Sequence, residues 1–224
     1  YNNNCQVLNE VANEFIDRVN KEPKADITYF PQGIGNGRPI AEMLKRAKED
    51  LVMLLEDDGF IFTPGIVKKC FDRIESGEID AIGSPRFACG FEVSKMLKRK
   101  HNLDYSGSGD IGPNFWPNFF FSKAADLRKT DGNFASFTFE KGRMYPELGG
   151  YIIEDGQYGD TFVWACIQLR NLGVRFGTVP QNHASPTEFE DRLNSKANWS
   201  LPLNFKWVHG GSLSTSWGGY LSGK

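Results

Sequence analysis

The sequence contains no apolar run near the roughly 18 residues that a membrane-spanning helix needs, and no signal-peptide pattern. Its four cysteines form no C-x-x-C pair, so neither a zinc site of that type nor a disulfide framework is indicated. The formal net charge is only -2, which gives nucleic acid no electrostatic reason to bind. We therefore expect buried free thiols, no transmembrane segment, no nucleic-acid partner, and a cytoplasmic protein or one peripheral to a membrane.

The chain of 224 residues is long enough for one large domain with a substantial core. Apolar residues at helical spacing and short apolar runs predict alternating helices and strands. The expected helices span about 5–19, 39–48, 63–77 and 160–171. The expected strands span 27–30, 51–55, 79–82, 114–121 and 174–179. Because helix and strand alternate in the first third, we predict an α/β fold with a mixed sheet flanked by helices.

Three consecutive acidic residues, Glu56, Asp57 and Asp58, follow the apolar strand predicted at 51–55. In open α/β sheets, ligands bind beyond the carboxyl ends of the strands, so these side chains are expected at that edge. Neighbouring carboxylates repel each other, and a hard divalent cation such as Mg²⁺ or Mn²⁺ removes that repulsion. The residues alone also allow a solvated acidic turn or a cap at the start of a helix.

The segment 51–67, LVMLLEDDGFIFTPGIV, resembles the D-x-D segment of GT-A glycosyltransferases, particularly the large family-2-like group. The stretch before it, GNGRPIAEMLKRAKED, resembles that family's Asn-Gly loop and following helix. The resemblance implies a GT-A (Rossmann-like) fold and a metal, Mn²⁺ or Mg²⁺, that bridges the diphosphate of a nucleotide sugar, here a UDP-sugar. It assigns direct metal ligation to Asp58, and contacts with ribose or a water-bridged metal to Glu56 and Asp57. Glu56 departs from the family's usual Asp.

A second segment, Gly159–Asp160–Thr161–Phe162, resembles the family's acidic residue at the start of an acceptor-side helix. In inverting members this carboxylate is the general base that takes the proton of the acceptor hydroxyl, and the acceptor is a glycan or another hydroxyl compound. The residue type alone also suits an N-cap, because Asp accepts hydrogen bonds from the first free amides of a helix. Glu154 and Asp155 are nearby substitutes for the catalytic role.

Two histidines are further candidates. The segment VRFGTVPQNHAS resembles the family region in which a His follows the last strand, which makes His183 a candidate metal or diphosphate contact. His209, in the Gly-rich sequence WVHGGSLS, is its rival. Either residue could equally be structural, since a lone His is not specific for a ligand site.

A GT-A domain normally carries a strand, a helix and a second strand ahead of its D-x-D segment. Only 55 residues precede Glu56, so we expect this N-terminal βαβ part, with its nucleobase contacts, to be missing. The single catalytic domain is then divided into a nucleotide-sugar-binding half at 1–90, an acceptor-side half at 91–183 and an irregular tail at 184–224.

Two other functions remain open at this stage. A haloacid-dehalogenase-like phosphatase also places acidic residues after a buried strand, but its first carboxylate is an Asp nucleophile, whereas Glu56 stands here. Phe60 also replaces the hydroxyl residue of that motif. A carbohydrate-binding or structural module would use the aromatic, Gly-rich tail and leave the acidic residues without a role.

Overall fold

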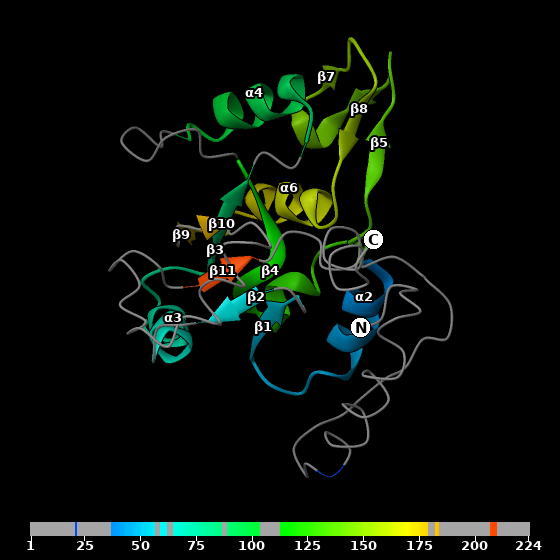
Figure 1. Ribbon diagram of the computed structural model, residues 1–224. Helices are drawn as coiled ribbons and strands as arrows, with labels where there is room; N and C mark the ends of the chain where they lie inside the picture. Colours follow the sequence, from blue (N-terminus) through cyan, green and yellow to red (C-terminus); the bar gives the residue numbers. More distant parts are fainter. Residues whose placement is uncertain are drawn as a thin grey trace, which may run out of the picture.

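The computed structural model describes residue 21 and residues 37–56, 59–61, 65–86, 89–103, 113–178, 182–183 and 207–209. The helix predicted at 5–19 and the strand predicted at 27–30 lie outside these residues. Figure 1 shows a sheet with helices on both sides and a second group of short strands beside α4. The protein is thus of the mixed α/β class, with a sheet flanked by helices, as the sequence predicts.

The main sheet has four strands in the order β1-β4-β3-β9. Their bounds are β1 Leu51–Leu55, β4 Asn114–Lys123, β3 Ala81–Arg86 and β9 Phe176–Thr178. β4 runs antiparallel to both of its neighbours, whereas β9 is parallel to β3. The continuous apolar run of β1 is typical of a strand among parallel neighbours. Within the described chain, however, β1 pairs with the antiparallel β4, which lies between β1 and β3.

Successive residues of the strands face two different apolar layers, which is why β1 is apolar throughout and β4 carries a run of three phenylalanines, Phe119 to Phe121. On one face, α3 (Ile66–Glu75) packs through Cys70 and Ile74 against Phe119 and Phe121 of β4. On the other face, three helices pack around Phe115 and Phe120. These helices are α2 Gly37–Arg46, α5 Ala124–Leu127 and α6 Val163–Asn171.

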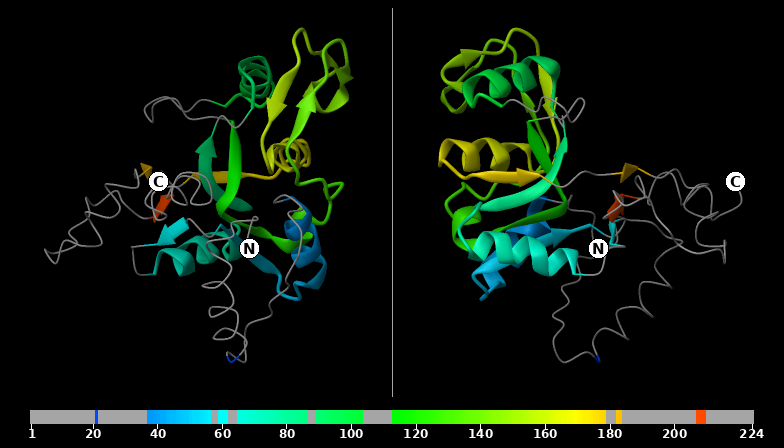
Figure 2. Two further views of the ribbon diagram at one scale, coloured as in Figure 1. Left: turned by 45° about the vertical axis from the view of Figure 1, so that its right-hand side comes forward. Right: turned by 90° about the vertical axis from the view of Figure 1, so that its left-hand side faces the viewer.

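Helix α6 is shared by two cores. Its residues Ala165 and Leu169 join the core of the main sheet, whereas Val163 and Ile167 join a second core on its far side. The second core is formed by a lobe of short elements. They are α4 Phe91–Lys100, β5 Phe137–Phe139, β6 Met144–Tyr145, η2 Pro146–Leu148, β7 Tyr151–Ile152 and β8 Gln157–Gly159. Figure 2 shows this lobe on one side of α6 and the main sheet on the other.

A small three-stranded sheet has the order β10-β11-β2. The strands are β10 Asn182–His183, β11 Trp207–His209 and β2 Gly59–Ile61. β11 differs from the irregular structure expected for residues 184–224. Its three residues are too few to produce a periodic pattern, and the pairing with β2 and β10 that forms the strand joins segments far apart in the sequence.

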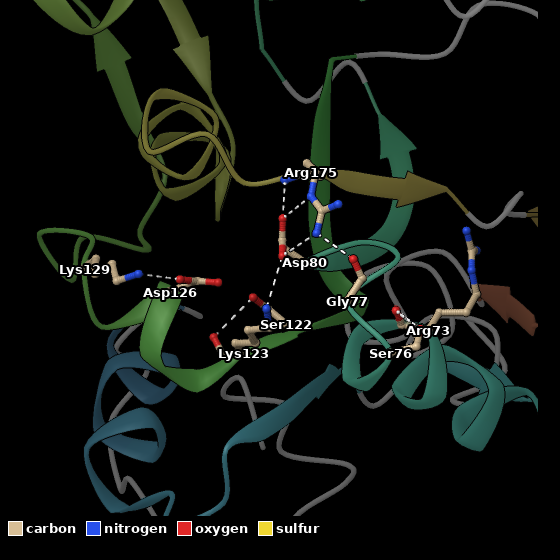
Figure 3. A network of polar contacts seen from close by, with 9 residues as sticks. All are labelled: Arg73, Ser76, Gly77, Asp80, Ser122, Lys123, Asp126, Lys129 and Arg175. Carbon is tan, nitrogen blue, oxygen red and sulfur yellow. Dashed lines mark hydrogen bonds and ion pairs between the residues drawn. The ribbon is translucent and has the colours of Figure 1, made fainter.

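An ion-pair network holds the end of the main sheet at which β1, β3 and β9 begin (Figure 3). Asp80 Oδ2 accepts hydrogen bonds from the backbone amide of Arg175 at 3.1 Å and from its Nε at 2.8 Å. Lys123 Nζ donates to Asp80 Oδ1 at 3.2 Å. The Arg175 guanidinium is the main reason that the pKa of the Asp80 carboxyl lies well below its usual range.

Replacing Asp80 by Asn should lower the free energy of unfolding at pH 7 by about 1–2 kcal/mol, since charge-assisted hydrogen bonds are lost but the cations are partly solvated. The depressed pKa means that this stabilisation is complete above the unfolded pKa of about 3.9 and is lost as pH falls below it. Urea unfolding between pH 7 and pH 2 should therefore show that the free energy of unfolding decreases less with falling pH in the variant than in the wild type. Equal pH profiles for the variant and the wild type would contradict this role of Asp80. Asp72→Asn is the control, because Asp72 forms an exposed ion pair with Lys68.

Within the described ranges, no helix combines the length and the apolar character that crossing a membrane requires.

Candidate functional site

The acidic residues begin where β1 ends. β1 closes at Leu55, Glu56 follows it in a partly buried position, and β2 begins at Gly59. Asp57 and Asp58 lie outside the described residues. The sequence-based expectation that this acidic segment follows a core strand is met, because Val52 and Leu54 contact one apolar core and Leu51 and Met53 contact the other.

The small sheet brings both candidate histidines to the same place. In the parallel pairing of β10 with β11, His183 lies opposite His209. In the antiparallel pairing of β11 with β2, His209 lies opposite Gly59, the residue directly after Asp58. Three segments that are far apart in the sequence therefore meet in one backbone row, beside the acidic segment.

The sequence presents His183 and His209 as rivals, but the register makes them neighbours. Nothing in the local sequence could indicate this, since β10 has two residues and β11 three. Metal ligands commonly come from separate segments that a sheet brings together, and carboxylate with imidazole is a workable donor set. In the part of the chain that the structure describes, no three His, Cys, Asp or Glu side chains form a metal-binding group; that part excludes Asp57 and Asp58.

Asp160 occupies the connection between β8 and α6. Its Oδ1 accepts hydrogen bonds from the Thr161 amide at 2.7 Å and from the Tyr158 hydroxyl at 3.0 Å. Burial, followed by the nearby Asp160 charge, raises the pKa of Tyr158, so the phenol stays protonated and remains a donor. No donor from the described residues reaches Oδ2 of Asp160, which leaves that oxygen able to accept a proton from a ligand.

The expectation that Asp160 is the N-cap of its helix is wrong. α6 begins at Val163, its N-cap is Phe162, and no side chain caps it. Asp160 instead hydrogen-bonds to the amide of its own neighbour, Thr161. The N-cap explanation therefore does not apply, and the carboxylate instead holds the connection before α6 through Tyr158 and Thr161.

Phe162 has a left-handed backbone with φ 74°, which is unfavourable for a bulky residue. The conformation is held by packing, because the ring is fully buried and contacts Phe120 and Phe134 with centroid distances of 4.8 and 5.8 Å. The Phe162 amide also donates to the Phe134 carbonyl at 2.9 Å. Strained backbone that is fixed by its surroundings is frequent at functional sites, and here it fixes the connection that carries Asp160.

The same contacts relate Asp160 to the acidic segment. Phe120 of β4, on which the Phe162 ring packs, lies opposite Leu54 in the β1–β4 register. Leu54 is two residues before Glu56, and Phe162 is two residues after Asp160. One layer of aromatic packing therefore connects the end of β1 with the start of α6.

The substitutes for Asp160 have other surroundings. Asp155 is exposed and forms an ion pair with Lys141 at 3.1 Å. Glu154 is also exposed, and its amide donates to the Glu92 carboxylate at 2.9 Å. Both lie in the turn between β7 and β8, so Asp160 is the carboxylate of this region that the packing positions most firmly.

Comparisons with protein-family models, with curated proteins and with solved structures find no match for the chain. The functional interpretation therefore depends on the residues, strand register and polar contacts described above.

Proposed function

We propose that this chain is a metal-dependent glycosyltransferase that moves a sugar from a nucleotide sugar, a UDP-sugar, to a hydroxyl group of a glycan or another acceptor. The observation that carries the proposal is the backbone row His183–His209–Gly59 next to the acidic segment at the end of β1. Ligand sites of open α/β sheets form at such strand ends. In this proposal the GT-A-like chain acts on the cytoplasmic side, free or peripheral to a membrane.

Glu56, Asp58 and His183 are the residues proposed to hold Mn²⁺ or Mg²⁺, with Asp57 directed to the nucleotide. A donor set dominated by carboxylate oxygens suits these ions. His209 becomes an equal candidate to His183, because the register brings both to the same row. When bound, such an ion supplies a Lewis acid that stabilises the charge of the leaving diphosphate, an effect worth several kcal/mol.

The proposed base is Asp160. The acceptor oxygen attacks the anomeric carbon while the bond from that carbon to the diphosphate oxygen breaks, and the nucleoside diphosphate leaves with the electron pair. The acceptor proton passes to Oδ2 of Asp160, while Tyr158 and Thr161 hold Oδ1 through the hydrogen bonds described above. Attack on the face opposite the leaving group inverts the configuration at the anomeric carbon. A base must lie within hydrogen-bond reach of the attacking oxygen.

The reaction class can be tested by incubating the protein with UDP-, GDP- and CMP-sugars, with Mn²⁺ or with a chelator, and with a mixture of glycan acceptors. We expect Mn²⁺-dependent release of one nucleotide and an acceptor whose mass increases by one sugar residue. Release of inorganic phosphate from a simple phosphoester would instead support a phosphatase. Sugar binding that requires neither nucleotide nor metal would support a carbohydrate-binding module.

A further inference from the structure

Asn118, in β4, is a buried amide without hydrogen-bond partners among the residues that the structure describes. Its side chain is 0% exposed, and neither Nδ2 nor Oδ1 has a partner in the described chain. Burying an amide in this way carries a desolvation penalty that no hydrogen bond offsets. Native proteins contain few such groups, and each needs a specific explanation, such as strain, a catalytic role or a bound molecule.

The position of Asn118 connects it with the candidate site. In the antiparallel pairing of β1 with β4, Leu55 lies opposite Phe119. Continuing this register by one residue places Asn118 across from Glu56, the first residue of the acidic segment. The unpartnered amide therefore lies at the same edge of the sheet as the proposed metal and diphosphate site.

The backbone around Asn118 is irregular. In the pairing of β4 with β3, Phe120 lies opposite Gly83 and Phe115 lies opposite Pro85. Between these two pairs, β4 advances by five residues while β3 advances by only two. A bulge of this kind bends a strand and redirects its side chains, and bulges are frequent next to active sites. Glycine at position 83 lets two rings of β4 approach the backbone of β3 here. A Cβ on this residue would lie 2.6 Å from Cδ1 of Phe115 and 2.8 Å from Cδ2 of Phe120.

Another buried polar residue of the same strand is satisfied. Ser122 is also 0% exposed, and its hydroxyl donates to the Lys123 carbonyl at 3.3 Å. Ser122 lies near the opposite end of β4, beside the Asp80 network. Within β4, the satisfied Ser122 therefore lies beside the Asp80 network, whereas Asn118, in the middle of the strand, has neither side-chain atom paired among the described residues.

We propose that Asn118 binds the sugar of the nucleotide-sugar donor, an inference that depends on the proposed function. An amide offers donors at Nδ2 and an acceptor at Oδ1, so its complement is a ligand with both kinds of group. Sugar hydroxyls meet this requirement. Phosphate oxygens only accept and would leave Oδ1 unpaired, whereas a metal ion would leave Nδ2 unpaired. Because Asn118 is shielded from water, a sugar hydroxyl that reaches it gains hydrogen bonds for which water does not compete.

The test compares UDP with UDP-sugars, each with Mn²⁺, on the wild type, Asn118→Leu and the control Ser122→Ala. Leu has nearly the same shape as Asn and no polar atoms, so Asn118→Leu should fold with equal or greater stability. Calorimetry should show unchanged UDP affinity in this variant but about 10–100-fold weaker binding of the UDP-sugar, as expected for losing two hydrogen bonds. Ser122→Ala should bind both ligands like the wild type.

Each other outcome has a distinct meaning. An unchanged preference for the UDP-sugar in Asn118→Leu would overturn the assignment. An equal loss for UDP and the UDP-sugar would also overturn it, because the contact would then be with the base or the phosphates. If Asn118→Leu does not fold, Asn118→Ala answers the same question, since it removes both polar atoms and adds neither volume nor charge. Failure of the wild type to bind any nucleotide would overturn the proposed function itself.

Discussion

Replacing Asp160 by Asn should lower the rate of sugar transfer by about 10²–10⁴-fold, the usual contribution of a general base. The amide oxygen of Asn can still accept hydrogen bonds from the Thr161 amide and the Tyr158 hydroxyl, so the connection before α6 should keep its conformation. What the variant loses is a group that can take the acceptor proton. Transfer rates, measured together with donor affinity by calorimetry, should show slow turnover with unchanged donor binding.

The matched control for this variant is Asp155→Asn. Asp155 is the nearby carboxylate that pairs with Lys141 in an exposed position, and its replacement should leave transfer unchanged. If Asp160→Asn turned over at the wild-type rate, Asp160 would have no part in the mechanism. If Asp155→Asn were the slow variant, the base would have to be reassigned to the β7–β8 turn.

Replacing Asp58 by Asn should weaken metal-dependent nucleotide binding by about 100-fold or more. A bound metal contributes several kcal/mol to the stabilisation of a diphosphate charge, and each 1.4 kcal/mol corresponds to a factor of ten. Calorimetric titration of UDP with Mn²⁺ and with a chelator measures this directly. The wild type should bind UDP much more tightly with Mn²⁺, and the variant should bind equally weakly in both conditions.

Asp50→Asn is the control for the Asp58 variant, because Asp50 is an exposed carboxylate at the other end of β1. It should bind UDP with Mn²⁺ as the wild type does. A wild-type affinity that is the same with and without metal would contradict the assignment of Asp58 as a metal ligand.

Much of the fold could be predicted because its main elements have strong local patterns. α3 has apolar residues at helical spacing that bury Ile66, Cys70 and Ile74, and Gly77 ends this region with φ 74°. The aromatic run that forms β4 was also predictable as an extended segment. The partners of these strands were not, because pairing is decided between residues far apart in the sequence. The antiparallel position of β4 between β1 and β3 is an example.

The site was predictable only where one segment carries it. Glu56 could be placed at a strand end from the adjacent apolar run alone. The proximity of His183 and His209 depends on the pairing of very short strands, which leave no periodic pattern. Asn118 is hidden within an aromatic run, and only the structure shows that its amide is buried without a partner among the described residues. The left-handed backbone of Phe162 likewise depends on tertiary packing.

The most direct test of the central proposal is a thermal-shift panel of UDP, GDP and CMP, each with and without Mn²⁺, on the wild type and Asp58→Ala. A ligand that binds only the folded state raises its stability by mass action, by about 2.7 kcal/mol at 100 times its Kd. We predict that one nucleotide, UDP, raises the melting temperature of the wild type only with Mn²⁺, and that Asp58→Ala abolishes this shift. No shift with any nucleotide, or an equal shift without metal, would contradict the proposal that this chain is a metal-dependent glycosyltransferase.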